Sequence, residues 1–434
     1  MDDLAYEPKI HPDRRPDAVV ETIDVASPGN PALREWAKAG LTEPDLETMR
    51  HYRLGRVRQQ LADNDFAGAV LYDPLNIRYA SDVSNMQVWC LHNACRYLFV
   101  ATEGPAVLFD FHGCEHLSQT MSTIDETRLA TSWFYFGAGP EERNRVTVWA
   151  AELADLVRLN GGGNRRIAVD KCDQLGLDAL IAEGLEPHTS MGFMEQARRI
   201  KHPEEIKAMR RAIHACETGM AAMWAALEPG LTENQLWAIL HRENIARGGE
   251  WIETRLLASG PRTNPWFHEC SDRVIEAGDM VAFDTDMVGP YGYCCDISRS
   301  WVAGTDRPSQ EQATLHAIAS EQIAYNLELL KPGMGFAEFS EKSYRPDPVY
   351  VPNRYSCVVH GVGLCDEYPS VAFPEDMKSG GYDGVFDPGM CICFESYTGA
   401  VGGREGVKLE RQSVITETGA ELLDTFSTNL VPDL

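Results

Sequence analysis

Apolar runs and helical stretches alternate along the first half of the chain. The run at residues 66–82 ends in a Pro-Leu-Asn turn, and residues 97–111 hold two strand-like runs around Glu103-Gly104-Pro105. Residues 146–164 predict a helix that ends at a run of glycines, and residues 165–170 predict another strand. This alternation indicates an α/β domain.

A long helix is predicted after this domain. Pro203 suits its first turn, with two acidic residues behind it, and Pro229-Gly230 ends it. Thr232 and Gln235 have capping-box spacing for the next helix. The apolar stripe of the long helix has helical spacing and is interpreted as core, and it consists of Ile206, Met209, Ile213, Cys216, Met220, Met223 and Leu227.

The second half mixes helices with hairpin-like strands. Residues 277–301 form two strands around Gly289-Pro290, and residues 389–399 and 404–419 form two more. We therefore expect an α/β or α+β protein with a largely antiparallel C-terminal sheet. The expected organisation is an N-terminal arm over 1–45, a first domain over 46–195 and a second domain over 196–434.

Composition narrows the classes of function. The length of 434 residues suits two domains, and 44% hydrophobic with 24% charged residues is normal for a globular protein. The net charge of −26 opposes binding to nucleic acid or to anionic membranes. The 12 cysteines are scattered and no secretory signal is seen, so we expect reduced thiols and a cytoplasmic location.

Carboxylates recur on strands that are otherwise apolar. In a regular strand Ala282, Asp284 and Asp286 would share one face. Burying an unpaired carboxylate is costly, so a positive partner is expected there. Asp296, Glu395 and Glu410 repeat the pattern on other strands, as does one histidine, His360.

Each of these residues alone has an ordinary explanation, such as an exposed acid at a strand end. Four or five acids and one histidine on separate strands favour a metal site. Oxygen donors with one imidazole suit Mn, Fe, Co or Zn, and several acids are able to bridge two ions.

At this point the chain resembles the pita-bread superfamily of methionine aminopeptidase, prolidase, aminopeptidase P and creatinase. The motifs "FDTD", "CCDISRS", "VVHGVGL", "CFE" and "GVKLE" stand in the family's order, and "DPLNIRYASD" resembles the N-terminal half of creatinase. The resemblance implies a creatinase-like first domain, a pita-bread catalytic domain with a curved sheet, and a homodimer. It implies these metal ligands: Asp284 or Asp286 or both, Asp296, His360, Glu395 and Glu410. It also implies that His268 is an active-site histidine.

The sequence departs from the peptidases in two places. The peptidases usually place the paired aspartates about eleven residues apart, whereas Asp296 is ten after Asp286 and twelve after Asp284, so which of the two binds stays open. The second departure follows His360. After His-Gly-x-Gly the peptidases have a second histidine that assists the tetrahedral intermediate, whereas here the aligned residue is Asp366. A carboxylate repels the oxyanion that forms during peptide hydrolysis, because both groups are negative, but it is a good proton acceptor. This feature is similar to the DddP-type dimethylsulfoniopropionate lyases of marine bacteria.

That second resemblance implies a carbon–sulfur lyase that forms dimethyl sulfide and acrylate by β-elimination, with Asp366 as base. The implied partner is a small zwitterionic sulfonium substrate, with Tyr355 as a binding residue. The implied metal is iron, with Mn, Zn, Co or Ni as alternatives and one or two ions. Aromatic faces suit the sulfonium: Tyr355 is the first choice, followed by Tyr368 and Trp89, and core packing is the competing interpretation for Trp89.

Two other functions compete with this one. The first is a prolidase or aminopeptidase P-like metallopeptidase that hydrolyses X-Pro peptides, and Asp366 in place of histidine discriminates against it. The second is a non-catalytic binding module that has kept the fold. It ranks last because every motif position holds a competent ligand.

Overall fold

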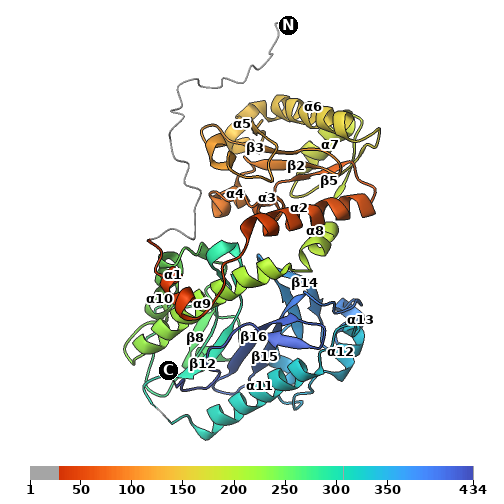
Figure 1. Ribbon diagram of the computed structural model, residues 1–434. Helices are drawn as coiled ribbons and strands as arrows, with labels where there is room; N and C mark the ends of the chain where they lie inside the picture. Colours follow the sequence, from red (N-terminus) through yellow and green to blue (C-terminus); the bar gives the residue numbers. More distant parts are fainter. Residues whose placement is uncertain (1–28, 306, 434) are drawn as a thin grey trace. The chain divides into compact units, whose positions relative to one another are not determined.

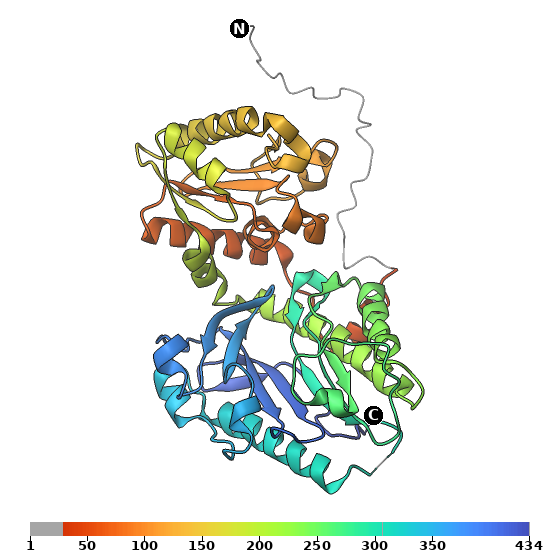
Figure 2. The same cartoon turned by 180° about the vertical axis from the view of Figure 1, so that it is seen from behind.

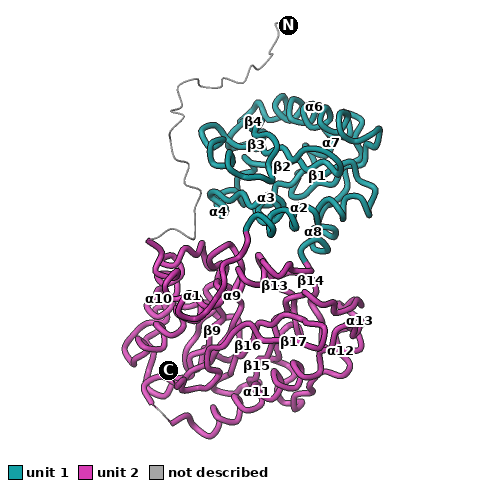
Figure 3. Tube along the Cα trace, in the orientation of Figure 1, with its two compact units in different colours: residues 1–24, 46–198 teal, residues 25–45, 199–434 magenta. Residues whose placement is uncertain are grey.

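The computed structural model describes residues 29–305 and 307–433, and these residues form two compact units (Figure 3). Unit 1 comprises Leu46–Arg198. Unit 2 comprises Arg199–Leu434 together with the segment that precedes Leu46, described from residue 29 onward. The first 28 residues of the predicted arm lie outside the described part of the chain.

Unit 1 is built on one six-stranded sheet in the order β4-β3-β2-β1-β5-β6. Its strands are β1 Gly68–Leu71, β2 Tyr97–Ala101, β3 Ala106–Asp110, β4 Glu126–Leu129, β5 Arg166–Val169 and β6 Glu186–Thr189. Its α-helices are α2 Leu46–Asp63, α3 Pro74–Ser81, α4 Gln87–His92, α5 Tyr135–Ala138, α6 Glu142–Asn160, α7 Gln174–Ala182 and α8 Met191–Arg198. Figure 1 shows α6 and α7 on one face of this sheet and α2 on the other. Unit 1 therefore has the expected α/β layering.

The apolar face of α6 forms much of the core of unit 1. Trp149 and Leu153 are buried against Phe99 and Phe109 of the central strands. The predicted hairpin β2–β3 and the helix that ends at Gly161 are both confirmed. The predicted Pro-Leu-Asn turn is wrong: Asp73 caps the helix α3 through a bond from the Leu75 amide, so the proline lies in its first turn.

Unit 2 contains three antiparallel sheets, in the orders β11-β10-β7, β12-β9-β8 and β14-β13-β15-β16-β17. The strands of the first two are β7 Trp251–Ile252, β8 Leu257–Ser259, β9 Met280–Asp284, β10 Met287–Val288, β11 Cys294–Cys295 and β12 Ser298–Val302. Those of the third are β13 Val359–Val362, β14 Asp366–Val371, β15 Cys391–Thr398, β16 Val407–Ile415 and β17 Ala420–Leu422. The predicted antiparallel C-terminal sheet is confirmed.

Helices pack around these strands (Figures 1 and 2). They are α1 Ala32–Lys38, α9 Pro203–Ala226, α10 Glu233–Ala246, α11 Gln310–Leu329, α12 Phe336–Lys342 and α13 Met377–Gly380. Helix α9 packs on α10, and α11 packs on β15 and β16. Met209, Ile213, Cys216, Met220 and Met223 of the predicted stripe are buried in α9, and the capping box of α10 is confirmed.

Part of the predicted arm belongs to unit 2. The Trp36 indole of α1 donates a hydrogen bond to the Arg211 carbonyl of α9, 3.0 Å away, and the Arg211 guanidinium lies over the Trp36 ring. Arg247 forms a two-point ion pair with Glu35 at 2.8 and 2.9 Å. These contacts fix the segment around α1 on unit 2.

All 12 cysteines are free, and most are buried. In the described part of the chain, none of the helices combines the length and the apolar character needed to cross a membrane.

Candidate metal centre

One face of the large sheet of unit 2 carries half of the predicted ligands, His360, Glu395 and Glu410. His360 on β13 lies directly opposite Cys393 on β15, and Glu395 lies opposite Glu410 on β16. Because side chains alternate along a strand, Cys393 and Glu395 point to the same face. The register therefore places an imidazole and two carboxylates from three strands side by side.

The three predicted aspartate ligands lie where strands are broken: Asp284 and Asp286 at the break between β9 and β10, and Asp296 at the break between β11 and β12. Strand β9 ends at Asp284, Asp286 follows with a φ of 35°, and Asp296 lies between β11 and β12. Thr285 joins the two interruptions, since its hydroxyl donates to the Cys295 carbonyl and accepts from the Ile297 amide. The prediction that Asp284 and Asp286 share a face by regular alternation is wrong; a break in the strand brings them together.

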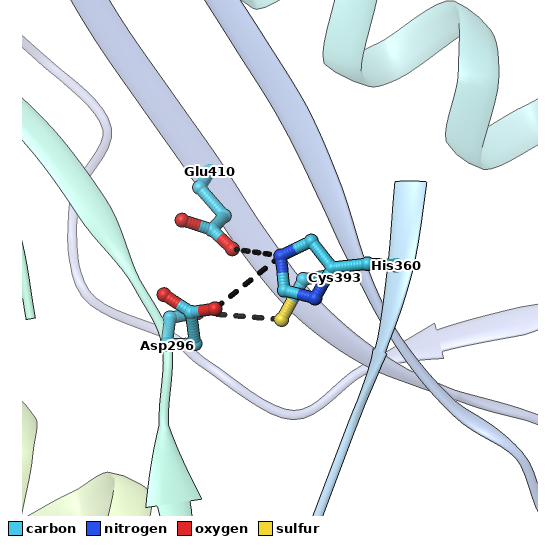
Figure 4. Close-up of side chains that lie close together, drawn as sticks. All are labelled: Asp296, His360, Cys393 and Glu410. Carbon is cyan, nitrogen blue, oxygen red and sulfur yellow. Dashed lines mark hydrogen bonds and ion pairs between the residues drawn. The ribbon is translucent and has the colours of Figure 1, made fainter. Parts of the chain in front are cut away.

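Carboxylate oxygens of three predicted ligands lie around Nε2 of His360. This nitrogen lies 3.2 Å from Glu395 Oε1, 3.4 Å from Asp296 Oδ2 and 3.5 Å from Glu410 Oε1. Figure 4 shows the imidazole pointing at Asp296 and Glu410. All four side chains are buried in unit 2.

The potential ligand atoms form two sets, and within each set all the atoms lie within 4.8 Å of one another. One set joins Asp296, His360, Cys393 and Glu410, and the other joins Asp284, Asp286 and Asp296. Among the residues that the structure describes, Asp284 Oδ1, Asp296 Oδ1 and Glu410 Oε1 are buried and have no hydrogen-bond partner. Such orphaned carboxylate oxygens beside an imidazole fit a hard or borderline divalent cation, and Asp296 is able to serve both sets.

Lys408 is the main residue that the sequence analysis missed. Its side chain is fully buried, and Nζ lies 2.7 Å from Glu395 Oε2, 3.0 Å from Glu410 Oε2 and 3.2 Å from Asp284 Oδ2. Each of these carboxylates thus gives one oxygen to the ammonium and keeps the other for the centre. Period-two alternation could have found it, because Lys408 lies two residues before Glu410 on the same strand.

We expect Lys408→Met to destabilise the metal-free protein by about 3–5 kcal/mol, because removing one partner of a buried ion pair leaves charge uncompensated. The metal-loaded protein should lose less, since a bound divalent ion compensates the same carboxylates. Urea unfolding of both forms measures the difference. Lys342→Met, at an exposed ion pair with Glu338, is the control. A loss below about 1 kcal/mol in the metal-free variant would contradict this role for Lys408.

Burial also governs the protonation of the ligands. Desolvation raises the pKa of Glu395 to about 7 and that of Asp284 to about 6, against the pull of Lys408 on both. A metal ion binds the ionised carboxylates, so protons compete with it below these values. We expect Mn²⁺ affinity to fall between pH 8 and pH 5.5, by about tenfold per pH unit for each proton displaced. Calorimetric titration at several pH values measures the affinity. An affinity that stays the same over that pH range would contradict the prediction.

Asp366 begins β14 on the hairpin that carries His360. Its Oδ1 lies 3.7 Å from His360 Nδ1, whereas the buried carboxylates lie near Nε2 of the same ring, and its side chain is 63% exposed. Asp366 and Ser370 share a face of β14, and Ser370 lies opposite His360. The structure therefore places the predicted base beside the centre, in a position that is open to solvent.

A buried ion pair anchors this hairpin. Lys201 Nζ lies 2.6 Å from Glu367 Oε2, with 3% and 1% of the two side chains exposed. The other Glu367 oxygen accepts the Leu364 amide at 3.1 Å. A side chain at Gly363 would displace this carboxylate, because a Cβ there would lie 2.5 Å from a Glu367 oxygen. The turn between β13 and β14 is thus held from the side opposite Asp366.

The other predicted site residues of unit 2 differ in their placement. Tyr355 lies near the buried carboxylates: burial and the charges of Glu395, Asp284 and Glu410 raise the pKa of its hydroxyl. Lys408 Nζ lies 4.5 Å from its ring centroid. His268 is half-buried, and its Nδ1 lies 3.0 Å from the Pro265 carbonyl oxygen. Within the described residues, no hydrogen bond or ion pair joins His268 to the buried carboxylates.

Trp89 lies in unit 1, on the short helix α4. It is 41% exposed, so the interpretation that it packs in the core is wrong. Met86, Val88 and Leu91 around it are also exposed. Tyr368 is packed, since its ring stacks on Tyr382 with centroids 5.6 Å apart.

Comparison with known proteins agrees with this geometry. The model of metallopeptidase family M24 matches residues 207–417. The Xaa-Pro dipeptidase of Bacillus anthracis superimposes with a TM-score of 0.72 at 21% identity, over 87% of this chain and 98% of that one. The dipeptidase PepE of Mycobacterium ulcerans gives 0.69 at 21% identity, over 90% and 99%. These structures show the predicted pita-bread fold.

Two curated relatives are much more similar in sequence. The dimethylsulfoniopropionate lyase DddP of Roseovarius nubinhibens is 47% identical over 91% of this chain and 90% of the relative. That of Roseobacter denitrificans is 43% identical over the same shares. A putative dipeptidase of Bacillus subtilis, YkvY, reaches 28% over 55% of the chain and 64% of its own length. The chain therefore belongs to the DddP family of dimethylsulfoniopropionate lyases within the pita-bread superfamily.

Proposed function

We propose that this enzyme cleaves dimethylsulfoniopropionate to dimethyl sulfide and acrylate, with Asp366 as the base. The observation that carries the proposal is the place of Asp366: an accessible carboxylate 3.7 Å from the imidazole of a buried, carboxylate-rich centre. A carboxylate in this position accepts a proton and does not stabilise an oxyanion. The membership of the chain in a lyase family supports the same reaction.

In this mechanism Asp366 takes the proton from the carbon next to the substrate carboxylate. The electrons of that C–H bond form the double bond of acrylate, the β C–S bond breaks, and its electron pair leaves on neutral dimethyl sulfide. Asp366 then returns its proton to solvent, to which its side chain is open. A divalent ion, when bound, supplies the Lewis acidity that makes the α-proton removable. Tyr355 and His268 are proposed to contact the substrate.

We propose Asp284, Asp286, Asp296, His360, Glu395 and Glu410 as the metal ligands. Two sets of ligand atoms that share Asp296 support one or two ions. Iron is the proposed metal, and Mn, Zn, Co and Ni are compatible with the same oxygen-rich donors. Metal analysis of protein purified without added metal tests this choice, since another metal at stoichiometric level would contradict it.

The competing activity is hydrolysis of X-Pro peptides, which the match to a metallopeptidase family favours. The two functions separate when a single metal-loaded preparation receives dimethylsulfoniopropionate and an X-Pro dipeptide in turn. We expect dimethyl sulfide in the headspace and no release of proline. Proline release without dimethyl sulfide would refute the proposed lyase function.

We further propose a homodimer that works in the cytoplasm. The exposed apolar side chains of α4 support an association surface. Twelve free cysteines agree with a reducing compartment. The net charge of −26 supports the absence of nucleic acid and membrane partners. Sedimentation at several protein concentrations tests the dimer.

A further inference from the structure

Phe267 is an exposed aromatic residue in an unfavourable backbone conformation. Its φ is 70°, and 58% of its surface is exposed. A bulky residue at positive φ is an outlier, and such strain persists where the surrounding structure enforces it, often at functional sites. The chain therefore holds an apolar ring in solvent at a cost in free energy.

The segment that carries Phe267 is attached to the strand that carries Glu395. The Tyr397 hydroxyl of β15 donates to the Thr263 carbonyl at 2.7 Å and lies 3.0 Å from Asn264 Oδ1. The Asn264 amide donates to the carbonyls of Ala400 and Gly403, just beyond the same strand. The segment that leads to Phe267 is thereby bonded to the strand that carries Glu395.

The ring of Phe267 also adjoins the Tyr355 ring. The two centroids lie 5.5 Å apart with an interplanar angle of 31°, and Trp266 and Tyr397 extend the aromatic group on the inner side. Lys408 already places its ammonium 4.5 Å from the Tyr355 centroid and 5.9 Å from that of Trp266. A second cation near those rings meets a like charge, so the aromatic residue of this group that is open to solvent and free of a neighbouring ammonium is Phe267.

We propose that Phe267 determines specificity by offering its ring face to the sulfonium group of the substrate. This inference rests on the proposed lyase function and names the residue that recognises the cationic end. A sulfonium has no N–H or O–H to donate, so an aromatic face binds it by cation–π attraction without a fixed anion. Tyr355, whose ring lies 4.5 Å from the Lys408 ammonium, then contacts the substrate through its hydroxyl.

Two unreactive ligands of the same shape separate charge from size. The cationic one is 3-(trimethylammonio)propanoate, and the neutral-headed one is 4,4-dimethylpentanoate. Calorimetry with metal-loaded protein gives the Kd of each. Phe267→Leu should weaken the cationic ligand by about 3- to 30-fold and leave the neutral-headed ligand within about twofold. Phe267→Tyr should retain the wild-type preference, because it keeps an aromatic face.

Tyr325→Leu is the matched control, since Tyr325 is 49% exposed on α11 of the same unit. It should change neither affinity. Equal weakening of both ligands by Phe267→Leu would overturn the inference, as would unchanged binding of both or wild-type protein that binds neither. Binding is read without turnover, so a wild-type enzyme that releases no dimethyl sulfide would refute the proposed function separately.

Discussion

Replacing Asp366 with asparagine should lower dimethyl sulfide release by about 10²–10⁴-fold, because the amide keeps the size of the side chain but accepts no proton. Asp366 lies outside the two sets of clustered ligand atoms, so metal content should stay at the wild-type level. Headspace chromatography and metal analysis of the same preparation measure both quantities. Asp366→Ala should give the same result.

The control for this variant is Asp376→Asn. Asp376 is an exposed aspartate of unit 2 that pairs with Arg354, and its neutralisation should leave turnover unchanged. Turnover retained in Asp366→Asn would show that another group takes the proton. Loss of metal together with activity would instead make Asp366 a residue of the metal site, and would remove the main support for its role as base.

Replacing His360 or Glu395 with alanine should remove metal and activity together. His360 supplies the imidazole that faces three carboxylates, and Glu395 is fully buried among them. Changes to residues that only support ligands cost about 10–100-fold in metal affinity, so loss of a ligand should cost more. Metal analysis after dialysis and calorimetric titration measure the loss.

His241→Ala serves as the control for this second prediction. His241 lies on α10 of the same unit, with its ring against Trp237, and its loss should leave metal content unchanged. Full metal occupancy in both His360→Ala and Glu395→Ala would refute the proposed set of ligands. Each variant should also be checked by circular dichroism, so that a failure to fold is not read as a failure to bind.

Much of the catalytic unit could be predicted from the sequence because its strands are apolar runs interrupted by single acids. Glu395 and Glu410 each stand in such a run, and the register of β15 and β16 places them opposite one another. Alternation failed at Asp286, because Thr285 bonds across the interruption and the chain turns to a φ of 35°. No local pattern reports a break that depends on a distant carbonyl.

Other features depend on tertiary contacts alone. The Pro-Leu-Asn segment starts a helix because Asp73 caps it, which turn-forming residues by themselves conceal. The strained conformation of Phe267 has no signal in the sequence, since it follows from the attachment of its segment to β15. The surface position of Trp89 could not be inferred either, because most tryptophans are largely buried.

The Lys201–Glu367 ion pair separates the support of the β13–β14 hairpin from its chemistry. The ion pair holds the buried face of β14, whereas the carboxylate of Asp366 projects from the exposed face of the same strand. A different side chain at residue 366 would stand on a hairpin with the same Lys201–Glu367 ion pair and beside the same His360 imidazole. A substitution at residue 366 is therefore expected to change the chemistry beside His360 while the Lys201–Glu367 ion pair stays in place.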